Sequence, residues 1–202
     1  MKTYLNLIKN SQTLLLVVSI AMLMILPSLL VFYPDSVNQN LLYFWAHISL
    51  FAVMLIRPLA DLLPQFKFIR PLVILRKGAG VFSAAIIISF IISKIIINPA
   101  GYFSAFATSD YWSLSGLALL AHLADISALL LLVTSNNLSK KILGAWWKRI
   151  QRLSYVYFYG SSFYLLFVFG DSTMIFYLIV VTFVTVLAFI KNRQAKLAIN
   201  PA

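Results

Sequence analysis

Long apolar stretches alternate with short polar or basic segments along the whole chain. A helix needs about 20 mostly apolar residues to cross roughly 30 Å of hydrocarbon. Stretches that meet or approach this length lie at residues 14–33, 41–56, 78–97, 114–133, 153–169 and 174–190. Turn-forming Pro, Gly, Asn and Asp residues stand between them. The pattern predicts an all-α integral membrane protein in which six transmembrane helices form a single domain across residues 1–202.

The first apolar stretch follows Lys2 and Lys9 and so begins as a signal peptide would. Its apolar core is longer than that of a signal peptide, and no small-x-small cleavage motif follows it. We therefore expect a retained transmembrane helix.

Basic residues collect on one side of the predicted helices. Because basic loops remain in the cytoplasm, both termini and the two long loops are expected inside, and the short loops outside. Asp35, Asp110 and Asp171 fall outside together with Lys94, whereas only Asp61 opposes the basic residues inside. Fifteen of the 16 basic residues lie inside: Lys2, Lys9, Arg57, Lys67, Arg70, Arg76, Lys77, Lys140, Lys141, Lys148, Arg149, Arg152, Lys191, Arg193 and Lys196. We expect a multi-pass protein of the bacterial inner membrane. Its net charge of +11 is explained by its orientation in the lipid bilayer and by attraction to anionic lipids, and does not indicate nucleic-acid binding.

The composition narrows the chemistry further. Apolar types make up 62% of the chain and charged types 10%, against roughly 25% charged residues in soluble domains. The lack of Cys excludes disulfides, zinc ribbons, iron–sulfur clusters and covalently attached haem. Glu is also lacking, so paired catalytic carboxylates would have to be Asp. The chain also has no nucleotide-binding motif and no hydrolase motif. We therefore expect no metal site, and neither a hydrolase nor a nucleotide-binding enzyme.

Three ionisable side chains fall inside predicted helices, where their energetic cost makes each one a functional candidate. They are His47 in the second helix, and His122 and Asp125 on one face of the fourth. They could hold a ligand or carry protons, or each could simply hydrogen-bond a neighbouring helix. We expect Asp125 to face the bundle interior, bonded to a neighbouring helix, in a pocket that it shares with His122.

Residues 139–152 combine basic and aromatic side chains just before the fifth predicted helix. Ile142, Trp146, Ile150 and Leu153 recur there at helical spacing. The pattern predicts an interfacial helix on the inner membrane face. A basic cytoplasmic loop with an aromatic belt would have the same composition.

Several short motifs occur in an order that is found in one membrane family. They are Arg57-Pro58, the stretch from Arg70 to Gly80, Thr134-Ser135-Asn136, Leu143-Gly144, Trp147, and Arg152-Leu153-Ser154-Tyr155. Across about residues 40–190 the chain resembles the ferric-reductase-like transmembrane domain. It is most similar to the haem-binding membrane subunits of bacterial periplasmic methionine sulfoxide reductase systems. The resemblance implies six helices with both ends inside, and a redox partner protein in the membrane or periplasm.

The resemblance also implies where haem would be held. The family has a haem-ligating His in the third helix, fourteen residues after an opening Arg; counted from Arg76, this position is Phe90. A second His corresponds to Gln151, and a third, thirteen residues later, corresponds to Tyr164. With these ligands replaced, the expected function is that of a haem-free relative: a structural or accessory membrane subunit, or one that binds a small cofactor such as a quinone or flavin.

Two alternatives stay open. In a bundle whose sequential helices are neighbours, the second and fourth helices form one diagonal and the third and fifth the other. An oxidoreductase subunit for electron transport could therefore hold one haem b between His47 and His122, which lie at similar depth. A proton-linked transporter could instead use His122 and Asp125.

Overall fold

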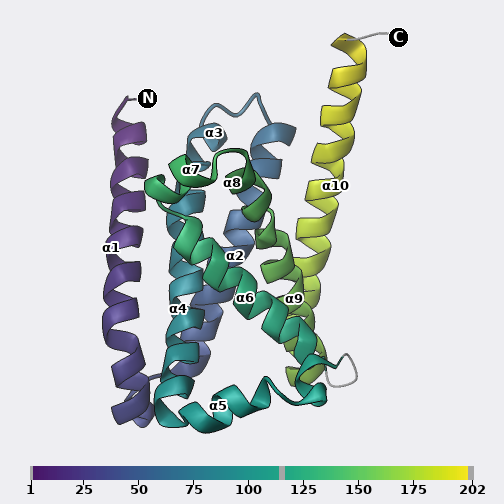
Figure 1. Ribbon diagram of the computed structural model, residues 1–202. Helices are drawn as coiled ribbons and strands as arrows, with labels where there is room; N and C mark the ends of the chain where they lie inside the picture. Colours follow the sequence, from purple (N-terminus) through teal and green to yellow (C-terminus); the bar gives the residue numbers. More distant parts are fainter. Residues whose placement is uncertain (1, 114–116, 200–202) are drawn as a thin grey trace.

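The computed structural model describes residues 2–113 and 117–199, and this part of the chain is helical without any strand. Six long helices carry the fold (Figure 1). They are α1 (Lys2–Phe32), α2 (Gln39–Leu62), α4 (Leu75–Ile97), α6 (Ala118–Thr134), α9 (Leu153–Phe169) and α10 (Thr173–Ile199). Shorter helices connect them: η1 (Pro34–Ser36), α3 (Ile69–Leu72), α5 (Pro99–Ala105), η2 (Ser109–Trp112), α7 (Asn137–Leu143) and α8 (Ala145–Ile150).

The helical structure of the described residues confirms the predicted all-α class, and several of these helices are long and apolar enough to cross a membrane. Within the described residues, four segments meet that standard: α1, α2, the α3–α4 stretch Ile69–Ile97, and α10 up to Ala195. A fifth is added if α6 and α7, which meet at an angle of 98°, are counted as one bent span. Helices α6 and α9 have 17 residues each, and therefore rise about 26 Å.

Several helices extend beyond the predicted apolar stretches, because an apolar pattern identifies only the part of a helix that is suited to the hydrocarbon core. Helix α1 begins at Lys2 and not at residue 14, and α10 continues to Ile199. Helix α2 runs on through Arg57 and Pro58 to Leu62. Residues 114–116 of the fourth predicted helix lie outside the described residues.

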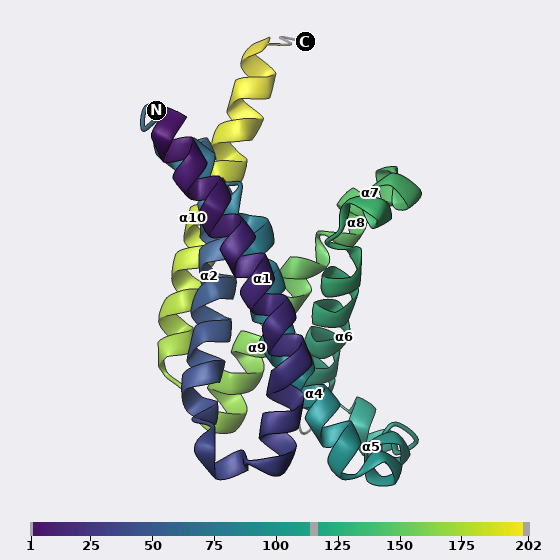
Figure 2. The same ribbon diagram turned by 90° about the vertical axis from the view of Figure 1, so that its left-hand side faces the viewer.

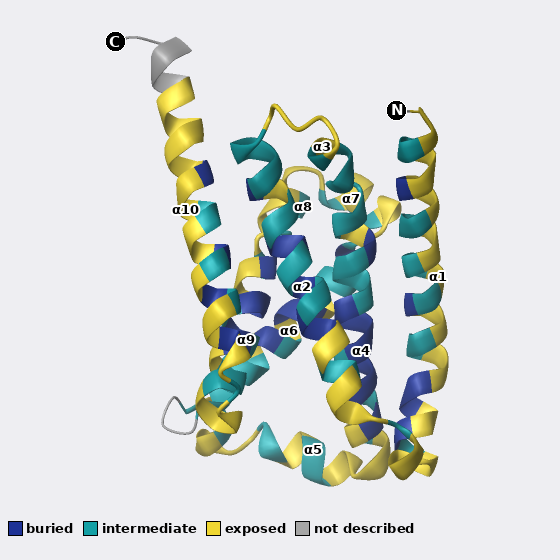
Figure 3. Cartoon of the chain, turned by 180° about the vertical axis from the view of Figure 1, so that it is seen from behind, coloured by how far each residue is buried: buried dark blue, intermediate teal, exposed yellow. Residues whose placement is uncertain are grey.

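Four helices form a ring in the order α2, α4, α6, α9, so that α2 faces α6 and α4 faces α9 across the bundle. This is the diagonal arrangement expected for sequential neighbours. Helix α1 packs mainly against α4, and α10 packs against α2 and α9 (Figures 1 and 2). The buried residues line the inward faces of the ring, whereas the outer faces of α1 and α10 are exposed and apolar (Figure 3).

Small residues let the helices approach closely, as is common in membrane bundles. Ala124 and Ala128 of α6 are buried against α9 and belong to the main core, together with Leu50, Met54, Ala84, Tyr157, Phe158, Leu178 and Val181. A Cβ atom added at Gly160 of α9 would lie 2.9 Å from the carbonyl oxygen of Leu120. Helices α6 and α9 can therefore come this close only because the residue at position 160 is a glycine.

Both termini, α3, α7 and α8 lie at one end of the bundle, and α5 lies at the other (Figures 1 and 2). We call these the termini end and the α5 end. Helix α5 was not predicted: Asn98-Pro99 resembles a plain turn, but Asn98 caps the helix by accepting the Gly101 N–H at 2.9 Å, and Pro99 occupies its first turn. The predicted interfacial helix over 139–152 is two helices, α7 and α8, because Gly144 adopts a φ of +51°.

Candidate functional site

His122 sits against an aromatic cluster at the α5 end. Its ring stacks on Tyr111 with centroids 3.3 Å apart and planes inclined by 10°. Phe106 and Trp112 lie around the same ring, and the Trp112 indole N–H donates to the Phe106 carbonyl at 2.9 Å. The segment between α4 and α6 thus covers His122 with aromatic side chains.

Burial, together with the nearby negative charges of an ionised Tyr102 or Asp125, raises the pKa of Tyr111 to about 12. Burial likewise raises the pKa of Tyr102. Both phenols lie outside the membrane-spanning helices and stay neutral at physiological pH. They therefore act on His122 and Asp125 as polar neighbours and not as charges.

His47 has a different environment. Its side chain is 7% exposed, and its Nδ1–H donates to the Tyr43 carbonyl oxygen, one turn earlier in α2, at 2.8 Å. In the neutral imidazole this bond leaves Nε2 without a proton, and an unprotonated Nε2 is the form that could ligate a metal. The charge that acts on His47 comes from Asp171, in the turn between α9 and α10.

The two histidines thus have different surroundings. His122 lies under Tyr111 and is acted on by Lys94, whereas His47 is acted on by Asp171. Their helices lie on one diagonal of the ring, and among the described residues no ring contact joins the two imidazoles. In the part of the chain that the structure describes, no group of three or more His, Cys, Asp or Glu side chains could hold a metal ion.

Asp125 is half-buried on α6. Lys94 is the cation that acts on it, and Asp125 in turn acts on hydroxyl groups from α2, α5, η2 and α9, those of Tyr43, Tyr102, Tyr111 and Tyr157. The carboxylate therefore lies within electrostatic range of these four hydroxyl groups. The expected hydrogen bond to a neighbouring helix is wrong for the described residues: Tyr43 and Tyr157 lie near enough to feel the charge, but their hydroxyls do not bond it. Tyr43 was missed as a candidate because a single Tyr near a helix end is usually interfacial.

Helices α4 and α9 are joined directly across the bundle. Ser83 Oγ and Tyr157 Oη share a hydrogen bond of 2.8 Å, and both side chains are buried. Phe90 and Tyr164 each follow this pair by seven residues on helices that run in the same direction (Figure 1). They consequently lie level with each other, about 10 Å nearer the α5 end.

Neither position holds the histidine that the resembled family uses to ligate haem. Phe90 is 7% exposed and stacks face to face on Tyr43, with centroids 4.5 Å apart. Tyr164 makes an edge contact with Phe169 at 5.8 Å. Gln151, in the turn between α8 and α9, has a buried side-chain nitrogen without a hydrogen-bond partner among the described residues. The three replaced positions thus offer one phenol and no imidazole, and the space beside Phe90 is filled by Tyr43, so these residues do not fit a haem.

Comparisons with protein-family models, with curated proteins and with solved structures find no match for this chain.

Proposed function

We propose that the chain is a haem-free, six-span membrane protein with a ferric-reductase-like bundle, acting as a structural or accessory subunit in the bacterial inner membrane. In this proposal the fold of an electron-transfer subunit is kept and the route for electrons is lost. The observation that carries it is the pairing of α4 with α9: Ser83 bonds Tyr157, and Phe90 stands level with Tyr164.

The register of α4 and α9 supports the resemblance. In the resembled family, haem ligands on the third and fifth helices have to face each other. Phe90 and Tyr164 were matched to two of these ligands from sequence alone, and they occupy equivalent levels on helices that form a diagonal. A chance alignment of motifs would not be expected to give matched levels.

The arrangement of the ends supports six spans with both termini inside. Helices α6 and α9 fall a few ångströms short of a typical hydrocarbon core, a mismatch that local thinning accommodates at small cost. Helix α7 turns by 98° from α6, as expected for a segment that lies along the membrane surface. The two long basic loops and both termini share the termini end, which the positive-inside rule assigns to the cytoplasm (Figure 2).

An electron-transfer assay in lipid vesicles tests this function. Vesicles that contain the protein and trapped ferricyanide are supplied with a membrane-impermeant reductant outside. We expect ferricyanide to be reduced no faster than in protein-free vesicles. A faster rate that disappears in His47→Ala would overturn the proposal in favour of electron transfer through a relocated haem.

A second candidate function, proton-linked transport at Asp125, is favoured by one observation: this half-buried carboxylate has no hydrogen bond to a described residue. An unsatisfied carboxylate inside a membrane bundle is costly and is usually kept for function. A pH-sensitive dye inside vesicles would report such transport. Proton flux that is lost in Asp125→Asn but kept in Asp110→Asn, a carboxylate on η2, would establish it; equal flux in both variants would exclude Asp125.

A further inference from the structure

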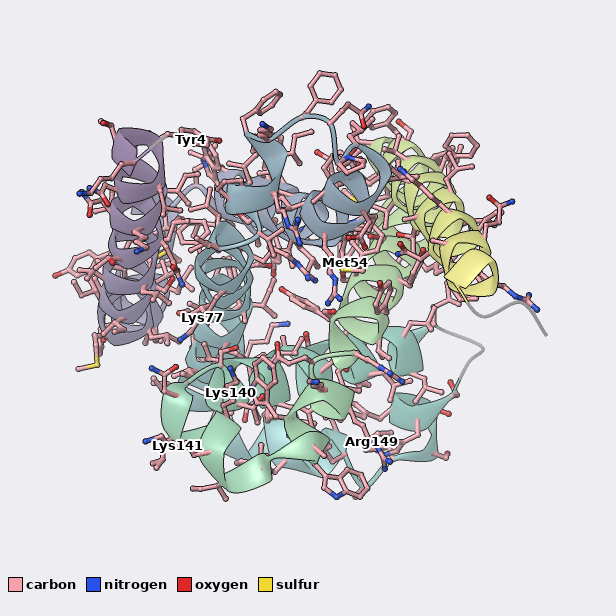
Figure 4. The ribbon with its side chains drawn as sticks, turned by 90° about the horizontal axis from the view of Figure 1, so that it is seen from above. Tyr4, Met54, Lys77, Lys140, Lys141 and Arg149 are labelled. Atoms are coloured by element: carbon pink, nitrogen blue, oxygen red, sulfur yellow. The ribbon has the colours of Figure 1, made fainter. Side chains whose placement is uncertain are left out.

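A cavity of about 720 Å³ opens at the termini end, between α2, α4, α9 and α10. Seen from this end, side chains tipped with nitrogen point into the space between the helices, on the near side of the buried Met54 (Figure 4). Four of the lining residues are arginines from three helices and the start of a fourth: Arg57, Arg76, Arg152 and Arg193. The cavity therefore concentrates guanidinium groups whose positions in the sequence indicate only the membrane topology.

The positive charge of the cavity is not neutralised by the protein. Asp61 is the one carboxylate in the lining, and its Oδ2 accepts a hydrogen bond from the Asn192 side chain at 3.3 Å. Within the described residues, none of the four arginines forms an ion pair with a carboxylate. Four cations against one anion leave the lining with a net charge of about +3.

Arg76 is held in place within this cluster. Its Nε–H donates to the Val53 carbonyl oxygen of α2 at 3.0 Å, which fixes the guanidinium and leaves its terminal N–H groups free for a ligand. Arg57 repels it electrostatically. Like charges held together in this way are stabilised when an anion lies between them.

A neutral group in the same lining is also unpaired. The side-chain oxygen of Thr185 on α10 is buried and has no hydrogen-bond partner among the described residues. Buried hydroxyls nearly always find a partner, so an orphaned one in a cavity wall points to an absent ligand or solvent molecule. Guanidinium and hydroxyl donors together match the acceptor oxygens of a phosphate group.

We propose that this cavity binds the phosphate of an anionic phospholipid headgroup from the leaflet at the termini end. Ala188 and Phe189 bring apolar surface into the lining, and Phe189 is 66% exposed on the outer face of α10, where acyl chains would run. A lipid can therefore place its phosphate among the arginines while its tails stay beside α10. Basic pockets between transmembrane helices on the cytoplasmic side are suited to such headgroups. The inference does not depend on whether the bundle binds haem.

Binding is tested on the full chain in neutral detergent. Dioleoylphosphatidylglycerol, dioleoylphosphatidylcholine and sodium phosphate are each titrated in while the thermal unfolding midpoint is recorded. We expect only phosphatidylglycerol to raise the midpoint in a saturable way. An equal rise with sodium phosphate would contradict the lipid source, and an equal rise with phosphatidylcholine would contradict recognition of the anionic headgroup.

Matched variants separate the cavity from general surface attraction. Arg57→Gln and Arg152→Gln remove guanidinium groups that make no side-chain hydrogen bond to a described residue, so both variants should fold. Each is expected to weaken phosphatidylglycerol binding about fivefold. Arg149→Gln removes a cation at the same end that stacks on Trp146 outside the cavity, and should leave binding unchanged (Figure 4). Equal effects in all three variants would overturn the proposal.

Discussion

Ser83 of α4 and Tyr157 of α9 share a hydrogen bond of 2.8 Å across the diagonal of the helix ring. Both are buried among Met54, Ala84 and Phe158, so the bond joins two helices that are not neighbours in the ring. In a bundle that carried a cofactor along this diagonal, the two helices would be bridged by that cofactor. Here they are bridged by side chains.

The bond makes a measurable contribution to stability. Ser83→Ala and Tyr157→Phe should each lower the free energy of unfolding by about 1 kcal/mol, because each leaves the partner hydroxyl unpaired or weakly paired. The double variant should cost little more than either single one, since both remove the same bond. Unfolding by sodium dodecyl sulfate, followed by circular dichroism, measures this.

Tyr177→Phe serves as the control for this pair. The Tyr177 hydroxyl on α10 makes no hydrogen bond to a described residue, although its ring stacks on Phe51. The variant should leave unfolding unchanged. Fully additive costs for Ser83→Ala and Tyr157→Phe would show that the bond does not join the helices.

Two glycines test the packing of the ring. In Gly160→Ala the new Cβ would lie 2.9 Å from the Leu120 carbonyl oxygen, a backbone atom that cannot rotate away, so α6 and α9 must separate. Overpacking of this kind costs about 1–3 kcal/mol. Gly80→Ala places its Cβ at an ordinary 3.8 Å from Val53 Cγ2 and should be tolerated. If thermal unfolding ranks the two variants in the opposite order, the α6–α9 contact is not as described.

The topology is open to a direct test with reporter fusions. Fusions after Asn38, Ser109 and Gly170 should report the outer face of the membrane, and fusions after Lys67, Lys141 and the C-terminus the inner face. The reason is that the basic loops share the termini end, while these three sites belong to loops at the α5 end (Figure 1). An inner-face signal at Ser109 would contradict six spans.

Sequence patterns predicted the helices wherever a strong local signal marks their ends. Helix α9 covers the residues expected of it because the basic Arg152 precedes it and Gly170 follows in the left-handed conformation, with a φ of +68°. Helix α5 was not predicted, because Asn98 and Pro99, which form its N-terminal cap and first turn, are also typical of a turn between helices. The N-terminal turns of α1 were not predicted because they are polar, and the prediction relied on apolar stretches.

The candidate site was harder to predict than the fold. His47 and His122 are equivalent by depth and diagonal, yet one lies buried on α2 and the other lies under Tyr111. That difference arises from the segment between α4 and α6, whose course cannot be predicted from the spacing of apolar residues in the sequence. The stacking of Phe90 on Tyr43 depends on two side-chain rotamers, and the arginine cavity depends on four helices meeting at one end. Each of these features requires tertiary structure.

The absorption spectrum of the protein purified from cells supplied with a haem precursor tests most directly whether the bundle lacks haem. We expect no Soret band near one haem per chain, because Phe90, Gln151 and Tyr164 replace the ligands and the residues around them close the space. As a control on haem supply, a cytochrome b from the same cells should be fully loaded. A Soret band that corresponds to about one haem per chain would show that the bundle binds haem despite the replaced ligands. If that band disappeared in both His47→Ala and His122→Ala, the relocated haem would be the correct description instead.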